Sequence, residues 1–417
     1  MKNYIQALKI LQKGKLRIKD EKINCLKSYN RVNSEDIYSK VNYPAANNTS
    51  LDGYAIKADD TKNLNKKNFK LFNIIGTISA GDAPSKKRTK KFQTVEIMTG
   101  GLIPKGFDTI IPVEEIIFYP NKKKPRFIQI NKRIKRYQNV RFKGSDFKKK
   151  DLVVKKGTVL SSKHILVFKT LGINIIKVKK IPNILFFSSG KEVTNNNKIQ
   201  DWKVRNANIH YINSIKNNFL FNLEYGGILS DRGEAVFEKQ IKKIFKSKVD
   251  MIITSGAVSA GKFDYIPKVI KRFRLSNFFK NVLIRPGKPI LFAKIKGKEK
   301  ALFGLPGNTI SSAACFRFFV FPYLRILLGL TKERPIKGIL KNSFKKKKKF
   351  THFLKSKIYT TKDGKSKVEI LSGQESFRIK PFVNSNIWAV LPSGKSNFRK
   401  NDIVDCFYLD RLNKFLI

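Results

Sequence analysis

The chain has 417 residues, and its 87 basic side chains against 30 acidic ones give a formal net charge of +57 at pH 7. This length predicts about two to four domains. A hydrophobic fraction of 41%, with 33 Phe and 13 Tyr, excludes disorder of the whole chain. Cys25, Cys315 and Cys406 lie far apart without CxxC spacing, which excludes a disulfide framework and favours a reducing compartment. No histidine pairs with a Cys or Glu at metal-ligand spacing, which disfavours a zinc enzyme.

The positive charge is spread along the whole chain. Its densest run, Lys345–Lys349, lies between two phenylalanines in a predicted surface hairpin. Replacement of neutral surface positions by Lys and Asn under a biased mutational composition gives the same pattern, and we favour this interpretation over evolved RNA or DNA binding. We therefore expect no specific nucleic-acid partner, although non-specific adhesion to polyanions follows from the field alone.

No targeting or membrane-spanning segment is predicted. The N-terminus reads as a short amphipathic helix without an apolar h-region. The most apolar stretch, 313–330, contains Arg317, Pro322 and Arg325, which favours a buried helix over a bilayer span. We expect a cytoplasmic protein without a membrane partner.

The first 180 residues change pattern twice. Residues 1 to about 40 are predicted to be helical, with Ile5, Leu8 and Leu11 on one face. From Tyr43 to about residue 135, short β-type runs separated by turns predict a small all-β module. Residues 136–180 mix turns with a helix over about 162–171.

A different rhythm begins at residue 181. Apolar strands ending in Ser-Ser-Gly and Ser-Gly alternate with helices expected over about 206–223 and 234–245, and a long helix is expected after Asn308. This alternation predicts a parallel α/β sheet. After about residue 331, alternating strands return and predict a C-terminal β domain. The predicted domains are 1–42 with 136–180, 43–135, 181–330 and 331–417.

Three strand ends of the predicted sheet carry small residues. Ligands of open α/β sheets bind at the carboxyl ends of the strands, where glycines allow close approach to a phosphate and a following helix adds donors. Each segment alone is an ordinary connection, but three at one edge favour a phosphate or nucleotide pocket. The candidate substrate-binding residues are Ser188, Ser189 and Gly190; Ser255, Gly256 and Ser259; and Pro306, Gly307 and Asn308.

Carboxylates are scarce, so those beside polar turns are candidate ligands. Glu192 and Asp264 follow the first two strand ends, and Mg²⁺ takes one or two carboxylates plus phosphate oxygens of a substrate. Similar turns adjoin Asp52, Asp146 and Asp231. For any one of them alone, a helix cap or Asx-turn is the favoured interpretation.

The 285–289 turn, Arg-Pro-Gly-Lys-Pro, supplies two cations on a rigid backbone. Such a turn suits contact with a phosphate or another oxyanion. The alternative is a solvated basic loop, which is common in this chain.

At these segments the sequence resembles the molybdopterin molybdenumtransferases, the MoeA-type proteins related to the C-terminal domain of gephyrin. The matching motifs occur in the family's order over nearly the whole chain, at Asn48–Ala55, Ile97–Gly100, Asn139–Arg141 with Gly144 and Asp146, Ser188–Gly190 with Glu192, Thr254–Gly256 through Asp264–Tyr265, Arg285–Pro289 and Gly304–Asn308. The chain departs from the family's pattern at Lys191, Ala257, Lys262 and Thr309.

The resemblance implies an elongated α/β multidomain homodimer. Its parts would be a central parallel α/β domain of the molybdopterin-binding type, a β module inserted into the first domain, and a C-terminal β-barrel-like domain. The implied reaction inserts molybdenum from molybdate into adenylylated molybdopterin with release of AMP, assisted by Mg²⁺, as the last step of molybdenum cofactor biosynthesis. Molybdopterin adenylyltransferase would be a further partner.

Site residues are carried over from the family one by one. The catalytic candidates are Asp52, Thr99, Asp146, Glu192, Asp264 and Lys288, and the substrate contacts gain Arg285 and Ser376. Ser376 rests on the loosely matching segment 373–376. Glu192 and Asp264 are the implied magnesium ligands.

Three alternative functions of the protein stay open. Molybdopterin adenylyltransferase shares the α/β domain but does not need the other domains. The remaining two are a non-enzymatic scaffold and an RNA-binding protein that uses the basic surface.

Overall fold

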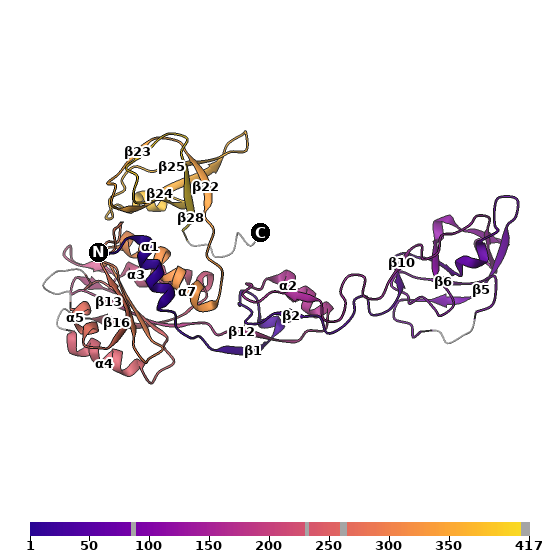
Figure 1. Ribbon diagram of the computed structural model, residues 1–417, viewed down its shortest axis with the longest axis horizontal. Helices are drawn as coiled ribbons and strands as arrows, with labels where there is room; N and C mark the ends of the chain where they lie inside the picture. The colour runs from indigo at the N-terminus through magenta and orange to yellow at the C-terminus, as the bar shows by residue number, and fades with distance from the viewer. Residues whose placement is uncertain (85–88, 230–232, 259–264, 410–417) are drawn as a thin grey trace.

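The computed structural model describes residues 1–84, 89–229, 233–258 and 265–409. The molecule is elongated, as expected (Figure 1). An α/β domain and a C-terminal barrel lie at one end, a narrow unit lies in the middle, and a β module lies at the far end (Figure 1).

The α/β domain contains a six-stranded sheet in the order β16-β13-β17-β21-β20-β18. Its strands are β13 (Asn183–Ser189), β16 (Asn222–Leu229), β17 (Met251–Ser255), β18 (Leu275–Lys280), β20 (Leu291–Ile295) and β21 (Ala301–Leu305), beside the short β14 (Val193–Thr194) and β15 (Val204–Arg205). The prediction of a parallel sheet is confirmed for β16, β13, β17 and β21, and two strands that were not predicted, β20 and β18, extend the sheet in antiparallel fashion. The connection over 296–300 is too short for the crossover that a parallel β20–β21 pair needs.

Helices cover both faces of this sheet. They are α3 (Ala207–Phe219), α4 (Glu234–Ile244), α5 (Ile266–Lys271), and the continuous run of α6 (Thr309–Cys315), a π-helical turn η4 (Phe316–Val320) and α7 (Phe321–Leu328). Successive side chains of a strand point to opposite faces. Phe186 therefore joins the core under α3, α6 and α7, whereas Phe187 joins the core under α4 and α5.

The run from Thr309 to Leu327 is, among the described residues, one helix long and apolar enough to cross a bilayer by length and composition. However, 83% of its apolar stretch is buried inside the protein. This confirms the predicted buried helix.

The N-terminal helix is much shorter than predicted. Helix α1 (Tyr4–Lys13) begins at an Asn3 capping box and ends at Gly14. Beyond it, buried Leu16 and Ile18 alternate with exposed basic residues, which is the period of an extended chain and not of a helix. The prediction of helix to about residue 40 was therefore wrong. Ala7 and Leu11 of α1 pack into the core of the α/β domain.

The middle unit is narrow and contains two short strand pairs. It comprises β1 (Asp20–Asn24) with β12 (Ile175–Lys179), β2 (Ile37–Tyr38) with β11 (Leu152–Val154), the 3-10 turn η1 (Cys25–Lys27) and α2 (Ser162–Thr170). Helix α2 agrees with the prediction over about 162–171.

The far module is a six-stranded sheet in the order β7-β4-β6-β5-β9-β8. Its elements are β4 (Gly53–Ile56), β5 (Lys70–Ile78), β6 (Gln93–Ile97), β7 (Thr109–Pro112), β8 (Ile117–Tyr119), β9 (Phe127–Ile130), η2 (Ala58–Thr61) and η3 (Val113–Glu115), and the paired β3 (Asn48–Thr49) and β10 (Val140–Arg141) lead into and out of it. The inserted β module is thus confirmed, whereas the domain boundaries at 42, 135, 180 and 330 stay predictions.

The C-terminal domain is a closed barrel, as predicted. Its elements are β19 (Ile284–Arg285), β22 (Ile336–Leu340), β23 (Phe344–Lys345), β24 (Thr351–Thr360), β25 (Ser366–Ile370), α8 (Lys380–Val383), β26 (Ile387–Leu391), β27 (Asn397–Phe398) and β28 (Ile403–Tyr408). The sheet closes because β24 pairs with β26 as well as with β25.

A buried arginine joins the barrel to the α/β domain. Arg317, in the π-helical turn, is 1% exposed and binds both carboxylate oxygens of Glu333 at 2.9 and 2.6 Å. Its Nε donates to the Tyr408 carbonyl at 2.7 Å, and its guanidinium lies 4.8 Å from the ring centre of Phe321. All its polar atoms are directed at the junction of the two domains.

Replacement of Arg317 by Met should lower the free energy of unfolding by about 3–5 kcal/mol, because it leaves Glu333 without its cation in a largely buried junction. Lys365→Met is the control, since Lys365 and Asp363 form an exposed ion pair, and its cost should stay below about 1 kcal/mol. Urea denaturation of both variants measures the difference. Equal costs would show that the Arg317 pair does not stabilise the junction.

Candidate functional site

Three strand ends converge at the carboxyl edge of the α/β sheet. Gly256 follows β17 with φ of +97°, and a Cβ there would lie 2.5 Å from the Ser189 carbonyl oxygen. A Cβ on Gly307, after β21, would lie 3.6 Å from the Cα of Gly256. The three small-residue segments therefore form one surface of closely spaced backbone, as phosphate contact requires.

A polar network fixes the end of β13. Ser188 Oγ donates to Asn206 Oδ1 at 2.7 Å, and Asn206 Nδ2 lies 2.9 Å from Asn195 Oδ1 and 2.8 Å from the Tyr225 hydroxyl. Ser188 is thus committed to an internal partner. Ser189 Oγ is buried and has no hydrogen-bond partner among the described residues, so it is the hydroxyl at this strand end that is left to accept one.

The third strand end is held by two amides. Asn208, in the first turn of α3, donates to the Gly307 carbonyl at 2.9 Å. Asn308 caps α6 by accepting from the Ser311 N–H at 3.1 Å. Pro306 is buried, whereas Gly307 and Asn308 are exposed at the edge.

Glu192 presents a carboxylate at the same edge. Both of its oxygens lie 2.5 Å from the position that a Cβ on Gly190 would occupy, so the side chain folds back over the glycine. It is exposed, and no residue in the described part of the chain donates to it or pairs with it. A free carboxylate beside a phosphate surface fits Mg²⁺, which completes its shell with phosphate oxygens and water.

Several predicted residues lie outside the described residues. These are Asp264, the second expected magnesium ligand, together with Ser259, Lys262 and Asp231. Within the described ranges, no group of three or more His, Cys, Asp or Glu side chains could hold a metal ion by itself.

The 285–289 turn lies between the α/β domain and the barrel. The backbone of Arg285, in β19, lies opposite that of His352 in the parallel pair of β19 and β24. The Arg285 guanidinium lies 5.0 Å from the ring centre of Phe350. Gly287 has φ of +97° and packs against Cys315 of α6, whose Sγ lies 3.4 Å from the Gly287 carbonyl oxygen. The turn therefore presents exposed Arg285 and Lys288 from a backbone fixed on both sides.

The loop that carries Ser376 is organised by a buried lysine. Lys355 of β24 donates to the carbonyls of Gly373, Glu375 and Arg378 at 2.8, 3.0 and 3.0 Å. After this loop, Phe382 of α8 contacts Tyr211 of α3 with 6.2 Å between ring centres. The Ser376 loop is thus tied to the helix that begins at the carboxyl edge of the sheet.

The remaining candidates lie at the opposite end of the molecule. Asp52 Oδ1 accepts from the Thr99 N–H at 2.7 Å and from the Thr99 hydroxyl at 2.8 Å, and these two bonds lower the pKa of its exposed carboxyl. Asp146 follows β10 on the way back from the inserted module, and its N–H donates to the Tyr43 carbonyl at 3.1 Å. Within one chain, the inserted module lies far from the α/β edge (Figure 1).

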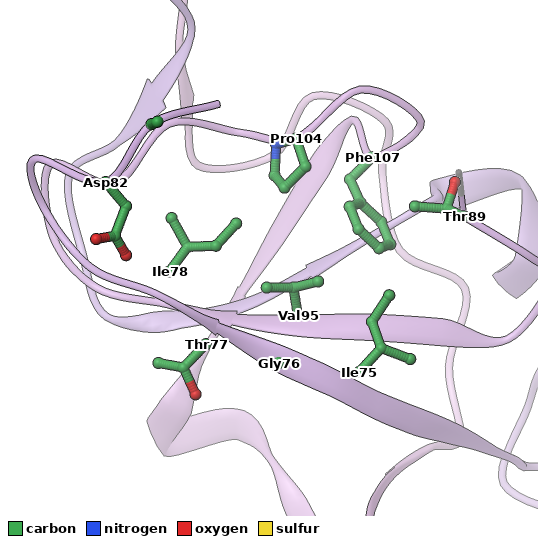
Figure 2. Close-up of a pocket in the computed structure, with 10 residues that line it drawn as sticks. Ile75, Gly76, Thr77, Ile78, Asp82, Thr89, Val95, Pro104 and Phe107 are labelled. Carbon is green, nitrogen blue, oxygen red and sulfur yellow. The ribbon is translucent and has the colours of Figure 1, made fainter. Parts of the chain in front are cut away.

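The inserted module also contains a cavity of about 350 Å³. Figure 2 shows Ile75, Ile78, Val95 and Phe107 around it, with Asp82 at one side. The Asp82 carboxylate is engaged by the Ser79 N–H at 2.6 Å. Thr77 and Thr89 also line the cavity, but Asp82 is the one ionisable group among the described lining residues and is already engaged, so we assign the cavity no part in the chemistry.

Sequence reasoning missed Asn206 and Lys355, which hold two of the candidate segments. Neither belongs to a motif that spacing singles out. For Lys355, the available signal was a lysine placed inside an alternating strand of the C-terminal domain.

Comparison with known proteins covers nearly the whole chain. Residues 3–172 match the MoeA N-terminal region (domains I and II), residues 186–326 a probable molybdopterin-binding domain, and residues 337–409 the MoeA C-terminal region (domain IV). The chain is 30% identical over 406 residues to a molybdopterin molybdenumtransferase of Staphylococcus epidermidis, covering 96% of this chain and 94% of the relative. It is 31% identical over 383 residues to that of Staphylococcus aureus, covering 91% and 88%.

The fold agrees with a solved structure. The crystal structure of the molybdopterin biosynthesis MoeA protein from Pyrococcus horikoshii superposes with a TM-score of 0.81 at 24% identity and covers 98% of this chain and 100% of that one. The α/β domain with its edge of small residues is therefore a domain of the molybdopterin-binding class. Together with the regions on either side, it shows that the chain belongs to the MoeA family.

One departure from the family's motifs has a visible backbone consequence. Ala257 stands in a Ser-Gly-Ala where the related motif has a second glycine, and its φ is +53°. This left-handed conformation costs an L-residue about 1–2 kcal/mol, whereas glycine adopts it freely.

Ala257→Gly should therefore be neutral or should raise the free energy of unfolding by up to about 1 kcal/mol, because relief of the backbone exceeds the entropy that glycine adds to the unfolded chain. Gly256→Ala should lower it by about 2 kcal/mol or more, since the new Cβ would press on the Ser189 carbonyl. Thermal denaturation compares the two. A Gly256→Ala variant as stable as the wild type would show that the strand ends do not approach as described.

Proposed function

We propose that this protein inserts molybdenum from molybdate into adenylylated molybdopterin and releases AMP. The observation that carries the proposal is the surface of closely spaced backbone at Ser189, Gly256 and Gly307 in a domain of the molybdopterin-binding class. The exposed cations of the 285–289 turn and the free Glu192 carboxylate add what an anionic substrate needs. Family membership and the names of the relatives agree with this reaction.

Each group has a distinct part in the proposed reaction. The glycine edge admits the phosphoanhydride, and a rigid backbone there orients it without reorganisation. Arg285 and Lys288 oppose negative charge on molybdate oxygens. Glu192 and Asp264 would hold Mg²⁺, which would supply positive charge to the oxygens of the phosphoanhydride that is cleaved to release AMP. No protein nucleophile is needed.

The alternatives explain less of the chain. A molybdopterin adenylyltransferase activity would leave the N-terminal and C-terminal MoeA regions without use. A scaffold or an RNA-binding protein would not need a free carboxylate and fixed cations around one edge. Two further proposals rest on the sequence alone: the protein is cytoplasmic, and molybdopterin adenylyltransferase is the partner that supplies its substrate.

We further propose a homodimer in which one subunit's inserted module completes the other subunit's site. Asp52 and Thr99 belong to the inserted module and Asp146 follows β10, and this module lies at the opposite end of the molecule from its own α/β domain (Figure 1). The middle unit also exposes apolar side chains on adjoining segments: Leu26 of η1 is 60% exposed, Leu166 of α2 is 68% exposed and Ile175 of β12 is 58% exposed. The N–H of Cys25 bonds to the Asn174 carbonyl, which places η1 beside β12. A two-fold contact would bury this face.

The direct test is AMP release from adenylylated molybdopterin by the purified protein, with and without molybdate. Lys288→Ala should raise the KM for molybdate at least about tenfold, the value of one charge-assisted contact. Lys239→Ala, at an exposed lysine of α4, is the control and should change nothing. Absence of molybdate-dependent AMP release from the wild type would reject the proposed function, and an unchanged KM in the Lys288 variant would remove this side chain from the site.

Leu166→Glu should convert the dimer to monomers, because a buried carboxylate on an apolar contact face is strongly unfavourable, and activity should fall with it. Val236→Glu, at the 54% exposed Val236 of α4, is the matched control. Light scattering reports the mass against 47.9 kDa for one chain. A wild type that is fully active as a single chain would contradict the shared site.

A further inference from the structure

The lysine run of the sequence forms an anchored loop of the barrel. It connects β23 to β24, and we call Lys345, Lys347, Lys348 and Lys349, which are exposed, the basic rim. The fifth lysine, Lys346, is buried and its ammonium donates to the Phe350 carbonyl at 2.8 Å. Two further bonds join the loop to the neighbouring segment, from Lys346 N–H to Ser396 and from Gly394 N–H to the Lys348 carbonyl, at 2.8 and 2.9 Å. The charges therefore have fixed backbone positions.

The basic rim adjoins the 285–289 turn. Strand β24, which follows the loop directly, pairs in parallel with β19, and the Thr351 N–H donates to the Leu283 carbonyl at 3.0 Å. The ring of Phe350 lies between two cations, with Lys349 Nζ at 5.4 Å and the Arg285 guanidinium at 5.0 Å from its centre. The rim and the proposed oxyanion turn thus form one continuous cationic surface.

No carboxylate neutralises this surface within the described part of the chain. The rim lysines, Arg285 and Lys288 form no ion pair there, although 18 ion pairs join carboxylates to other basic side chains of the described residues. The neighbouring His352 also lies close to these positive charges. Burial first, and then the charges of Lys346 and Arg285, lower its pKa to about 4, and its Nε2 has no hydrogen-bond partner among the described residues.

We propose that the basic rim captures the anionic substrates electrostatically and delivers them to the 285–289 turn. Fixed, unpaired charges beside a site raise the local concentration of an anion and its association rate, most strongly at low ionic strength. The rim is then a distinct functional part of the positive surface of this chain. This inference rests on the proposed function, because it assigns the rim to that same site.

The test compares two triple variants of equal charge. Lys347→Ser/Lys348→Ser/Lys349→Ser removes three charges from the rim, and Lys239→Gln/Lys243→Gln/Lys246→Gln removes three exposed lysines on and just after α4. The first measurement is kcat/KM for adenylylated molybdopterin from 20 to 300 mM salt. The second is the affinity for inorganic pyrophosphate at 20 mM salt, by calorimetry. The replaced lysines are all exposed, and the rim variant loses the contact of Lys349 with the Phe350 ring but none of the backbone bonds that hold the loop, so both variants should fold.

The rim variant should lose about five- to tenfold in kcat/KM at low salt and less than about twofold at high salt, with kcat unchanged, because screening removes the advantage of the wild type. It should also bind pyrophosphate more weakly, whereas the control variant should behave as wild type in both measurements. Equal losses in the two variants would overturn the proposal in favour of net charge. A rim variant with wild-type kcat/KM at low salt and wild-type pyrophosphate affinity would overturn it outright.

Failure of the proposed function gives a different pattern. If the wild type releases no AMP, that function is rejected, and the pyrophosphate affinities still decide whether the rim gathers phosphate anions. Equal affinities of wild type and rim variant would then reject the rim as well.

Discussion

The 285–289 turn, together with Ile284 before it, is the constraint on which the arrangement of the site depends. Its first residues pair with barrel strand β24, and its glycine packs so closely on α6 that a Cβ there would lie within van der Waals overlap of Cys315 Sγ. One short segment therefore fixes two domains and presents Arg285 and Lys288 between them. The Arg317–Glu333 pair reinforces the same junction from the other side of α6 and α7. Because position and charge come from one segment, a change in the junction would also change the electrostatics of the site.

This junction lies at the end of the molecule that holds the α/β domain and the barrel, and the inserted module lies at the other end (Figure 1). The α/β edge, the turn, the Ser376 loop and the basic rim are held together at one end by backbone and side-chain hydrogen bonds. Asp52 and Thr99 are held equally well, by two bonds to one carboxylate oxygen, at the other end. The two ends are separated by the length of the molecule (Figure 1). The proposal that a second subunit completes the site rests on this separation.

The sequence predicted the parts of the fold whose signals are local. Buried strands ending in Ser-Gly, the helix after Asn308 and the alternating strands of the barrel are patterns of a few residues each. Strands β18 and β20 were not predicted, and their antiparallel direction could not be, because an apolar strand carries no sign of its direction in the sequence. The early end of α1 was missed because the alternation of apolar and basic residues over 16–18 is short and lies among many lysines. Convergence of three strand ends was predictable from the rule for α/β sheets. The roles of Asn206 and Lys355, and the place of the lysine run beside Arg285, depend on contacts distant in sequence.

Mixing two defective subunits tests the shared site most directly. Asp52→Asn damages the inserted module and Lys288→Ala damages the turn, so each homodimer should be nearly inactive. The assay uses molybdate well below the KM of the Lys288 variant, where that parent is strongly impaired. In co-expressed heterodimers purified through two different tags, a site built from both subunits leaves one of two sites fully wild type, and AMP release should return to about half of the wild-type rate. If every site were formed within one chain, each subunit of the heterodimer would carry one defect. AMP release would then stay at the level of the parent variants, which would contradict the shared site.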